Sequence, residues 1–188
     1  QKLPMAQSAP PEKEHVMNLP NKLTLARIVM IPLCVTLICL HAYPWAAAVF
    51  ALAAVTDFLD GYLARKNHQV TVFGKFADPV ADKLLVLTAM IALTAQSLLP
   101  AWAVCVVTAR ELAVDGLRLV AAGRQNVVAA SILGKIKTNL QLLCVLSALL
   151  FLPRAVTMTL TVAMAVMTLV SGADYFYKLR DVWKENDA

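Results

Sequence analysis

The stretch from Asp57 to Asp82 reads D-F-L-D-G-Y-L-A-R-K-N-H-Q-V-T-V-F-G-K-F-A-D-P-V-A-D, and its four aspartates stand within or at the ends of apolar segments. A carboxylate at membrane depth is costly, and such residues usually mark functional sites. On a helix, Asp57 and Asp60 share one face, and Asp78 and Asp82 share a face of the next helix. The stretch therefore predicts two antiparallel helices that present four carboxylates to one pocket.

The composition of the whole chain indicates an integral membrane protein. Of its 188 residues, 60% are hydrophobic and 15% are charged, whereas about 25% of a soluble domain is charged. The four cysteines lie in apolar segments without a C-x-x-C pair, which argues against a disulfide framework or a zinc site. The net charge of +5 does not indicate nucleic acid, because the basic residues lie in short segments beside apolar runs. This placement favours membrane lipids as partners.

Six apolar stretches are predicted to be transmembrane helices, because about 20 residues cross the hydrocarbon core of a bilayer. The fold class is therefore an all-α integral membrane protein. The segment N-L-P-N-K-L-T-L-A-R at 18–27 is expected to form a short interfacial helix before the first span. We expect residues 1–16 to be a disordered extension or an artificial addition, and 17–188 to be the membrane domain. The expected spans are 23–40, 45–64, 75–99, 101–122, 132–152 and 155–177.

The basic residues predict the orientation of the spans. The three connections marked by Pro44, Pro100 and Pro153 carry a single basic residue, Arg154, and no acidic residue. All other Lys and Arg lie near the termini or toward the opposite ends of the spans. By the positive-inside rule, both termini and the aspartate pocket face the cytoplasm.

The chemistry of the aspartate stretch indicates a metal-dependent reaction on a phosphoryl group. Four unpaired carboxylates would repel one another, and several would stay protonated unless divalent cations were bound. Oxygen-only ligands suit Mg²⁺, Mn²⁺ or Ca²⁺, and two such ions can clamp a phosphoryl group. Gly61 and Gly74 allow a bulky ligand close to the backbone. Arg65 could bind phosphate through its guanidinium or serve as a membrane anchor.

The spacing D-x2-D-G-x2-A-R-x8-G-x3-D-x3-D resembles the motif of the CDP-alcohol phosphatidyltransferases, integral membrane enzymes with six helices. The segments N-L-P-N-K-L-T-L-A-R, A-R-E-L-A-V-D-G-L-R and G-K-I-K-T also resemble the phosphatidylglycerophosphate synthase branch of that family. The resemblance covers residues 17–184. The eight matching motif positions are Asp57, Asp60, Gly61, Ala64, Arg65, Gly74, Asp78 and Asp82.

The resemblance implies a reaction and its site residues. The phosphatidyl group of CDP-diacylglycerol would pass to sn-glycerol 3-phosphate, giving phosphatidylglycerophosphate and CMP at a bacterial-type cytoplasmic (inner) membrane. Two Mg²⁺ ions (Mn²⁺ is possible) would be held by Asp57, Asp60 and Asp78. Asp82 would contribute to the second ion and act as the general base, although it could be a ligand alone. The CDP site would comprise Asn21, Thr24, Arg27, Gly61, Ala64, Arg65 and Gly74.

A second group of charged residues lies on the fourth and fifth predicted spans. Its cations outnumber Glu111 and Asp115, and the surplus suits an anionic acceptor such as a phosphate monoester. The two acids could instead belong to a structural ion network between helices. Lys137 could also face lipid head groups, which leaves Arg118 and Lys135 as the firmer candidates. The predicted ligands of the acceptor phosphate are Arg110, Arg118, Lys135 and Lys137.

Three residues near these spans carry weaker signals. Tyr175 is expected in an aromatic belt at the inner interface, and its neighbour Asp174 could pair with a cation of the fifth span. Gly116 suits close helix packing or the face of a homodimer.

Other functions remain open. The same scaffold could use phosphatidylglycerol, inositol phosphate or serine as acceptor. A divalent-cation transporter would need carboxylates near the middle of the membrane that are accessible from both sides. A structural membrane protein with a polar helix interface would leave the eight-position spacing unexplained.

Overall fold

The structure, a computed structural model, describes the backbone of residues 19–66, 72–123 and 132–180. Side chains are described for residues 24–56, 80–121 and 132–180. All regular structure in these ranges is helical, which confirms the predicted all-α class, and the helix boundaries lie close to the expected ones. The six helices are α1 (Leu19–Cys39), α2 (Tyr43–Lys66), α3 (Val72–Ala95), α4 (Ala101–Gly123), α5 (Ile132–Leu149) and α6 (Arg154–Lys178).

Helix α1 is continuous from Leu19 to Cys39, so the described part of the chain has no separate interfacial helix before the first span. Pro20 lies in the first turn, where a backbone N–H has no partner within the helix, and therefore does not interrupt it. Pro32 lies inside the helix and removes one backbone hydrogen bond. The hydroxyl of Thr36 donates to the carbonyl of Pro32 at 2.8 Å.

The three turns marked by proline in the sequence share one helix-ending motif. His41, Ser97 and Phe151 have positive φ angles of 60°, 58° and 51° and follow the ends of α1, α3 and α5. In each case the next residue donates its backbone N–H to a carbonyl five residues earlier, as in Leu98 to Leu93 at 2.9 Å. This is the Schellman pattern, which usually has glycine at the left-handed position. The backbone bonds offset the steric cost of a side chain there.

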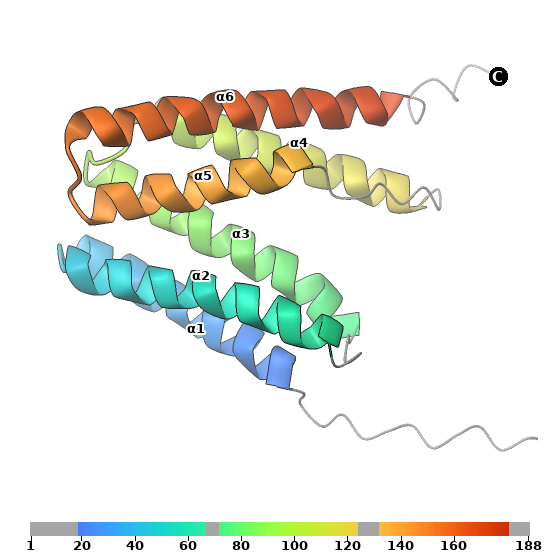
Figure 1. Cartoon of the computed structure of the whole chain (residues 1–188), viewed down its shortest axis with the longest axis horizontal. Coiled ribbons are helices and arrows are strands. Elements are labelled where there is room, and N and C mark those ends of the chain that lie inside the picture. Colours follow the sequence, from blue (N-terminus) through green and yellow to red (C-terminus); the bar gives the residue numbers. More distant parts are fainter. Residues whose placement is uncertain (1–18, 67–71, 124–131, 181–188) are drawn as a thin grey trace, which may run out of the picture.

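The helices run alternately up and down and form two groups, which Figure 1 shows as a lower and an upper layer. Helices α1, α2 and α3 pack together, α6 packs on α4 and α5, and α3 also contacts α4 and α5. The turns after α1, α3 and α5 lie at one end of the bundle (left in Figure 1). The C-terminal ends of α2, α4 and α6 lie at the other end, as the orientation argument expected.

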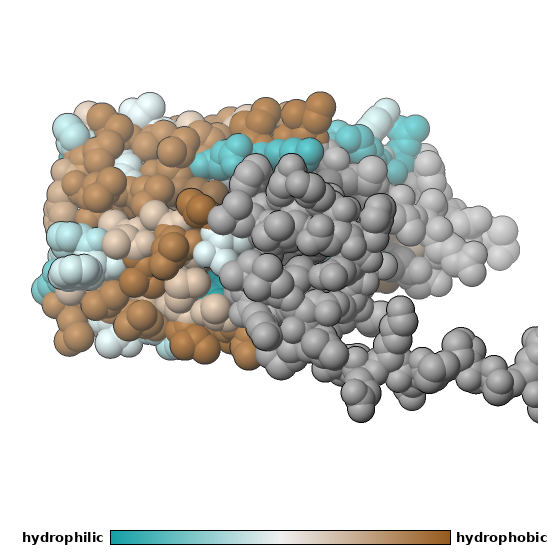
Figure 2. Space-filling model, turned by 60° about the horizontal axis from the view of Figure 1, so that its bottom comes forward, coloured by the Kyte–Doolittle hydropathy of each residue, from teal (hydrophilic) through white to brown (hydrophobic). Residues whose placement is uncertain are grey.

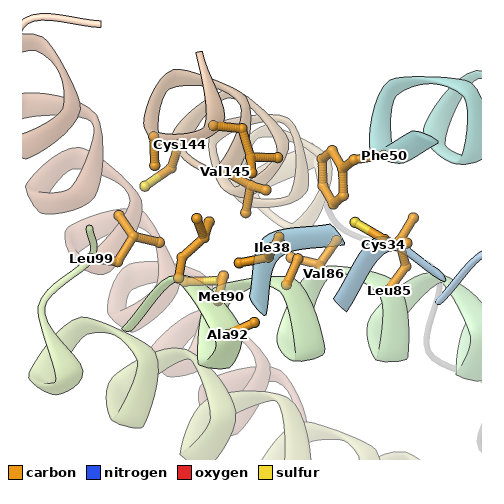
Figure 3. Packing of buried hydrophobic residues seen from close by; sticks show 14 of the residues in the cluster. Cys34, Ile38, Phe50, Leu85, Val86, Met90, Ala92, Leu99, Cys144 and Val145 are labelled. Atoms are coloured by element: carbon orange, nitrogen blue, oxygen red, sulfur yellow. The ribbon is translucent and has the colours of Figure 1, made fainter. Parts of the chain in front are cut away.

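A large hydrophobic cluster joins the two groups, and Figure 3 shows part of it from close by. All six helices contribute side chains to it, and these pack by van der Waals contact. A smaller cluster between α4 and α6 contains Val114, Leu117, Ala121, Tyr175 and Leu179. Labelled members of the large cluster include Cys34, Ile38, Phe50, Leu85, Val86, Met90, Cys144 and Val145.

The exterior of the bundle is unusually apolar for a soluble protein, and several charged or polar residues are buried inside it. Buried residues include Arg27, Glu111, Lys137 and Gln141, whereas large hydrophobic residues are exposed on all six helices. Figure 2 shows that hydrophobic residues predominate on the described surface of one face. A contiguous apolar exterior indicates contact with lipid or another apolar partner. By length and composition, α5 and α6 could each cross a membrane, and α1 and α2 contain shorter apolar segments within their described residues.

Candidate active site

The predicted metal-binding aspartates lie on two consecutive, contacting helices. Asp57 and Asp60 lie in the C-terminal part of α2, and Asp78 and Asp82 in the N-terminal part of α3. These parts lie at the same end of the bundle (Figure 1). Of the four side chains, that of Asp82 is described, and those of the other three lie outside the described residues. The helix placement agrees with the sequence argument, and the four-carboxylate pocket itself stays a prediction.

A small polar cavity borders Asp82 where α3 meets α4 and α5. Its volume is about 40 Å³, enough for a water molecule or a small group of a ligand. The buried amide nitrogen of Gln141 has no hydrogen-bond acceptor among the described residues. A buried donor of this kind favours a polar occupant. The cavity is lined by Asp82, Lys83, Val86, Leu87, Glu111, Lys137, Thr138 and Gln141.

Glu111 is the acid of a buried ion network beside this cavity. Its carboxylate pairs with the ammonium of Lys137, and these side chains are 5% and 6% exposed. Arg110 Nη1 lies 3.5 Å from both carboxylate oxygens, and Arg110 Nη2 donates to Ser171 Oγ at 2.6 Å. The network thus joins α4, α5 and α6. Lys137 faces the interior. The alternative prediction, that it faces the lipid head groups, is therefore wrong.

Asp115 belongs to a second ion pair, with Lys83 on α3. The sequence analysis did not single out Lys83, although it directly follows Asp82. This pair links the helix that carries the last motif aspartate to α4. Asp115 is thus paired with Lys83, whereas Glu111 contacts Arg110 and Lys137, two of the predicted acceptor ligands. Lys83 adds a cation that the sequence count did not include.

Tyr175 lies inside the protein, so its expected place in an aromatic belt is wrong. Its side chain is 1% exposed, between α4 and α6. Arg118 Nη2 donates to the Tyr175 hydroxyl, and the guanidinium carbons of Arg118 and Arg110 lie 4.8 and 5.7 Å from the ring centre. Tyr175 thus holds two of the predicted acceptor ligands by a hydrogen bond and cation–π contacts. Tyr177, by contrast, is exposed as a belt residue would be.

Among the remaining predicted residues, some have described side chains and the others do not. Lys135 is exposed near the start of α5, and Thr24 and Arg27 of α1 are buried and face neighbouring helices. Asp174 pairs with Lys178 on its own helix at 2.8 Å and not with the fifth span. Side chains outside the described residues are those of Asn21, Gly61, Ala64, Arg65 and Gly74.

Two glycines near the network differ in their surroundings. A Cβ on Gly172 would lie 3.2 Å from Arg110 Cγ, so the absence of a side chain on α6 gives Arg110 its place. A Cβ on Gly116 would meet nothing within 4 Å. The expected close packing at Gly116 is therefore wrong within the described chain, and a role in a homodimer face stays a prediction.

The sequence also matches the CDP-alcohol phosphatidyltransferase family over residues 17–170, which include the whole aspartate stretch and both ion pairs. The chain belongs to this family. CDP-alcohol phosphatidyltransferases are membrane enzymes of phospholipid biosynthesis. The protein is therefore a phosphatidyltransferase, and the aspartates and cations described above are its candidate site residues.

Relatives within the CDP-alcohol phosphatidyltransferase family are similar over nearly their full length. A CDP-diacylglycerol–glycerol-3-phosphate 3-phosphatidyltransferase of Bacillus subtilis is 46% identical, covering 87% of this chain and 95% of the relative. A probable phosphatidylglycerophosphate synthase of Mycobacterium tuberculosis is 39% identical over 95% of this chain and 92% of its own. A CDP-diacylglycerol–glycerol-3-phosphate 3-phosphatidyltransferase of Sodalis glossinidius is 39% identical, covering 87% of this chain and 96% of the relative.

CDP-alcohol phosphatidyltransferases generally use a divalent metal ion. The motif supplies carboxylates only, which is the donor set that Mg²⁺ and Mn²⁺ prefer. The half-buried Asp82 beside a polar cavity is compatible with this role. No group of three metal-binding side chains occurs among the described residues, and three of the four motif aspartates lie outside them.

Proposed function

We propose that this protein transfers the phosphatidyl group of CDP-diacylglycerol to sn-glycerol 3-phosphate, releasing CMP and forming phosphatidylglycerophosphate. The observation that carries the proposal is the near full-length similarity to relatives named for this reaction, at up to 46% identity. The cations on α4 and α5 support it independently, because a phosphate monoester needs positive partners and an uncharged alcohol does not.

The donor half of the proposed site lies on α1, α2 and α3. Arg65 binds the pyrophosphate of the donor, and Asn21, Thr24 and Arg27 close over the nucleotide. Gly61, Ala64 and Gly74 let it approach the helix backbones. Asp57, Asp60, Asp78 and Asp82 hold two Mg²⁺ (or Mn²⁺) ions. When bound, these ions stabilise negative charge on the phosphoryl group and on the departing CMP.

The acceptor half lies on α4, α5 and α6. Arg118 and Lys135 bind the phosphate of glycerol 3-phosphate, with Arg110 and Lys137 behind them. Asp82 takes the proton of the acceptor hydroxyl, whose oxygen attacks the lipid-side phosphorus in line. A new phosphorus–oxygen bond forms to the acceptor as the bond to CMP breaks. Tyr175 and Ser171 keep Arg118 and Arg110 in position through their hydrogen bonds.

We further propose that all six helices span a bacterial-type cytoplasmic membrane, with both termini and the active site on the cytoplasmic side. The first turns of α1 would lie in the interface, where Lys22 can reach lipid phosphates. We expect a homodimer, which cross-linking in native membranes would detect. The uneven distribution of basic residues between the two ends of the bundle supports this orientation.

An acceptor panel tests the proposed reaction. Purified protein is given CDP-diacylglycerol, Mg²⁺ and one of glycerol 3-phosphate, phosphatidylglycerol, inositol phosphate or serine, and CMP release is measured. We expect turnover with glycerol 3-phosphate at least about 100-fold above that with serine, because serine has no phosphate and loses charge-assisted contacts worth several kcal/mol. Turnover with glycerol 3-phosphate should also exceed that with inositol phosphate and phosphatidylglycerol, which carry a phosphate on a different alcohol. Turnover with another acceptor alone would show that the acceptor is misassigned while the transferase reaction stands.

Asp78→Asn and Asp82→Asn test the metal-dependent chemistry and the rival cation transporter. Each substitution should lower turnover by at least about 1,000-fold, because it removes a metal ligand or the base, while the protein stays folded in detergent. Near wild-type turnover in either variant would rule out the two-metal account. The transporter alternative predicts instead that divalent cations enter proteoliposomes without CDP-diacylglycerol.

A further inference from the structure

A large cavity among the described residues lies at the end of the bundle opposite the aspartates. Its volume is about 470 Å³, within the range of pockets that bind small molecules. It is formed where the turn between α3 and α4 meets the turn between α5 and α6. None of the residues proposed for phosphatidyl transfer lines it.

The wall of this cavity carries positive charge without a counterion. Arg154, the first residue of α6, lines the cavity and has no acidic partner among the described residues. It is also the single basic residue of the three connections at this end, which contain no acid. The first turn of α6 has no acidic residue, and the side chain of its N-cap, Pro153, makes no capping hydrogen bond. Free N–H groups and the helix dipole at such an end favour an anion.

Thr157 supplies a second, independent indication of a polar ligand. It lines the same cavity and is 7% exposed. Its hydroxyl makes no hydrogen bond within the described chain. The hydroxyls of Thr159 and Thr161 on the same helix instead donate to the carbonyls of Ala155 and Thr157, at 2.8 and 2.7 Å. The side chain of Thr157 is thus almost completely buried, and its hydroxyl is left to bond a polar ligand atom in the cavity that it lines.

Apart from Thr94 and Ser97, the rest of the cavity lining is apolar, and part of it is exposed on the hydrophobic exterior. Phe151, Leu152 and Met158 line it and are also exposed, as residues in contact with acyl chains would be. A free phosphate ion would fill only a small part of this volume. A ligand with a phosphate at one end and a hydrocarbon part at the other matches both walls.

We propose that this cavity binds one anionic phospholipid from the leaflet opposite the active site. The lipid phosphate lies against Arg154 and the N-terminus of α6, and the hydroxyl of Thr157 donates to a headgroup or ester oxygen. The first carbons of the acyl chains pack on Phe151, Leu152 and Met158. This site is separate from the proposed transfer site, so either can fail without the other.

Native mass spectrometry of the purified full-length chain tests the proposal. The protein is titrated in detergent with phosphatidylglycerol or phosphatidylcholine, and with inorganic phosphate as the free anion. The variants are Arg154→Gln and Thr157→Val. Lys178→Gln is the matched control, since it removes an exposed cation at the other end of α6. CMP release is measured for all of them.

We expect one phosphatidylglycerol site that Arg154→Gln weakens about tenfold and Thr157→Val about threefold, as loss of a charged and a neutral hydrogen bond should. Lys178→Gln should bind like wild type, and turnover should be unchanged throughout. The proposal fails if Arg154→Gln binds the lipid like wild type, or if phosphatidylcholine binds equally well. Displacement of the lipid by millimolar phosphate would identify a free-anion site and also overturn it. Arg154→Lys keeps the positive charge and should therefore bind the lipid nearly as well as wild type. This variant separates the loss of charge from a structural effect of substituting Arg154.

Discussion

The carboxylate of Glu111 on α4 and the ammonium of Lys137 on α5 form an ion pair that is almost completely buried. The pair borders the small cavity next to Asp82. Desolvating two charges is costly, and the pair is stable only because each charge compensates the other. Arg110 adds a second cation to the same carboxylate. The three side chains thus comprise two basic residues and one acid, and both basic residues are among those proposed above for the acceptor phosphate.

Breaking this pair should destabilise the protein strongly. Lys137→Met removes the closest counterion of Glu111 and should lower the free energy of unfolding by about 3 kcal/mol. Denaturant or thermal unfolding in detergent measures the loss. Lys135→Met is the control, because Lys135 is exposed two residues earlier and should change stability by less than about 0.5 kcal/mol. Equal stability of the two variants would contradict the buried pair.

The Lys83–Asp115 pair should matter more for activity than for stability. Both side chains are partly exposed, so the pair contributes only about 0.5–1 kcal/mol to folding. However, the pair connects α3 to α4 at the residue directly after Asp82 and so holds Asp82 in position. A small displacement of a catalytic group lowers reaction rates strongly. Lys83→Asp and Asp115→Lys should each reduce kcat about tenfold or more, whereas the double exchange should recover part of it. If the kcat of the double variant is no higher than that of each single variant, the pair has no positioning role.

Tyr175 should act through Arg118. Arg118→Ala and Lys135→Ala should raise the KM for glycerol 3-phosphate about tenfold or more, since each removes a charge-assisted contact to phosphate, and leave the KM for CDP-diacylglycerol unchanged. Tyr175→Phe keeps the ring under Arg118 and removes the hydroxyl, so its effect on the same KM should be smaller, about threefold. Steady-state kinetics with each substrate varied separately gives these values. Tyr177→Phe, at an exposed position, should be silent.

The space at Gly172 should control Arg110. An alanine there would push Arg110 Cγ by a few tenths of an ångström. We expect a two- to fivefold rise in the KM for glycerol 3-phosphate, roughly what a small misplacement costs. Gly116→Ala is the matched control, since its Cβ meets nothing. It should leave kinetics unchanged and stabilise α4 by about 0.5–1 kcal/mol. Indistinguishable kinetics in the two variants would show that Arg110 is not confined by Gly172.

The sequence predicted the helices and their order well, because each helix has its own apolar run and a proline marks the connection at one of its ends. The start of α4 at Ala101 was expected at that residue. The placement of the aspartate-bearing helix ends at one end of the bundle also followed from the alternating connections. These features depend on local chemistry and on the alternation of short turns.

The partners of the charged residues could not be predicted, because they depend on which helices lie side by side. Glu111 and Asp115 are four residues apart on α4, yet one acid contacts α5 and the other contacts α3. Tyr175 was misplaced because an aromatic residue near a helix end has the same sequence signature at a lipid interface and in an interior. Its contact with Arg118 bridges two helices far apart in the chain.

The division of the bundle into two groups of helices, with α3 in contact with both, has a consequence for how such proteins diversify. The motif aspartates lie on α2 and α3, whereas the cations proposed for the acceptor lie on α4 and α5. Substitutions in the second group could change which alcohol is accepted while the nucleotide chemistry of the first group is preserved. Exchange of the segment from α4 to α6 between relatives is therefore a route to new phospholipid head groups.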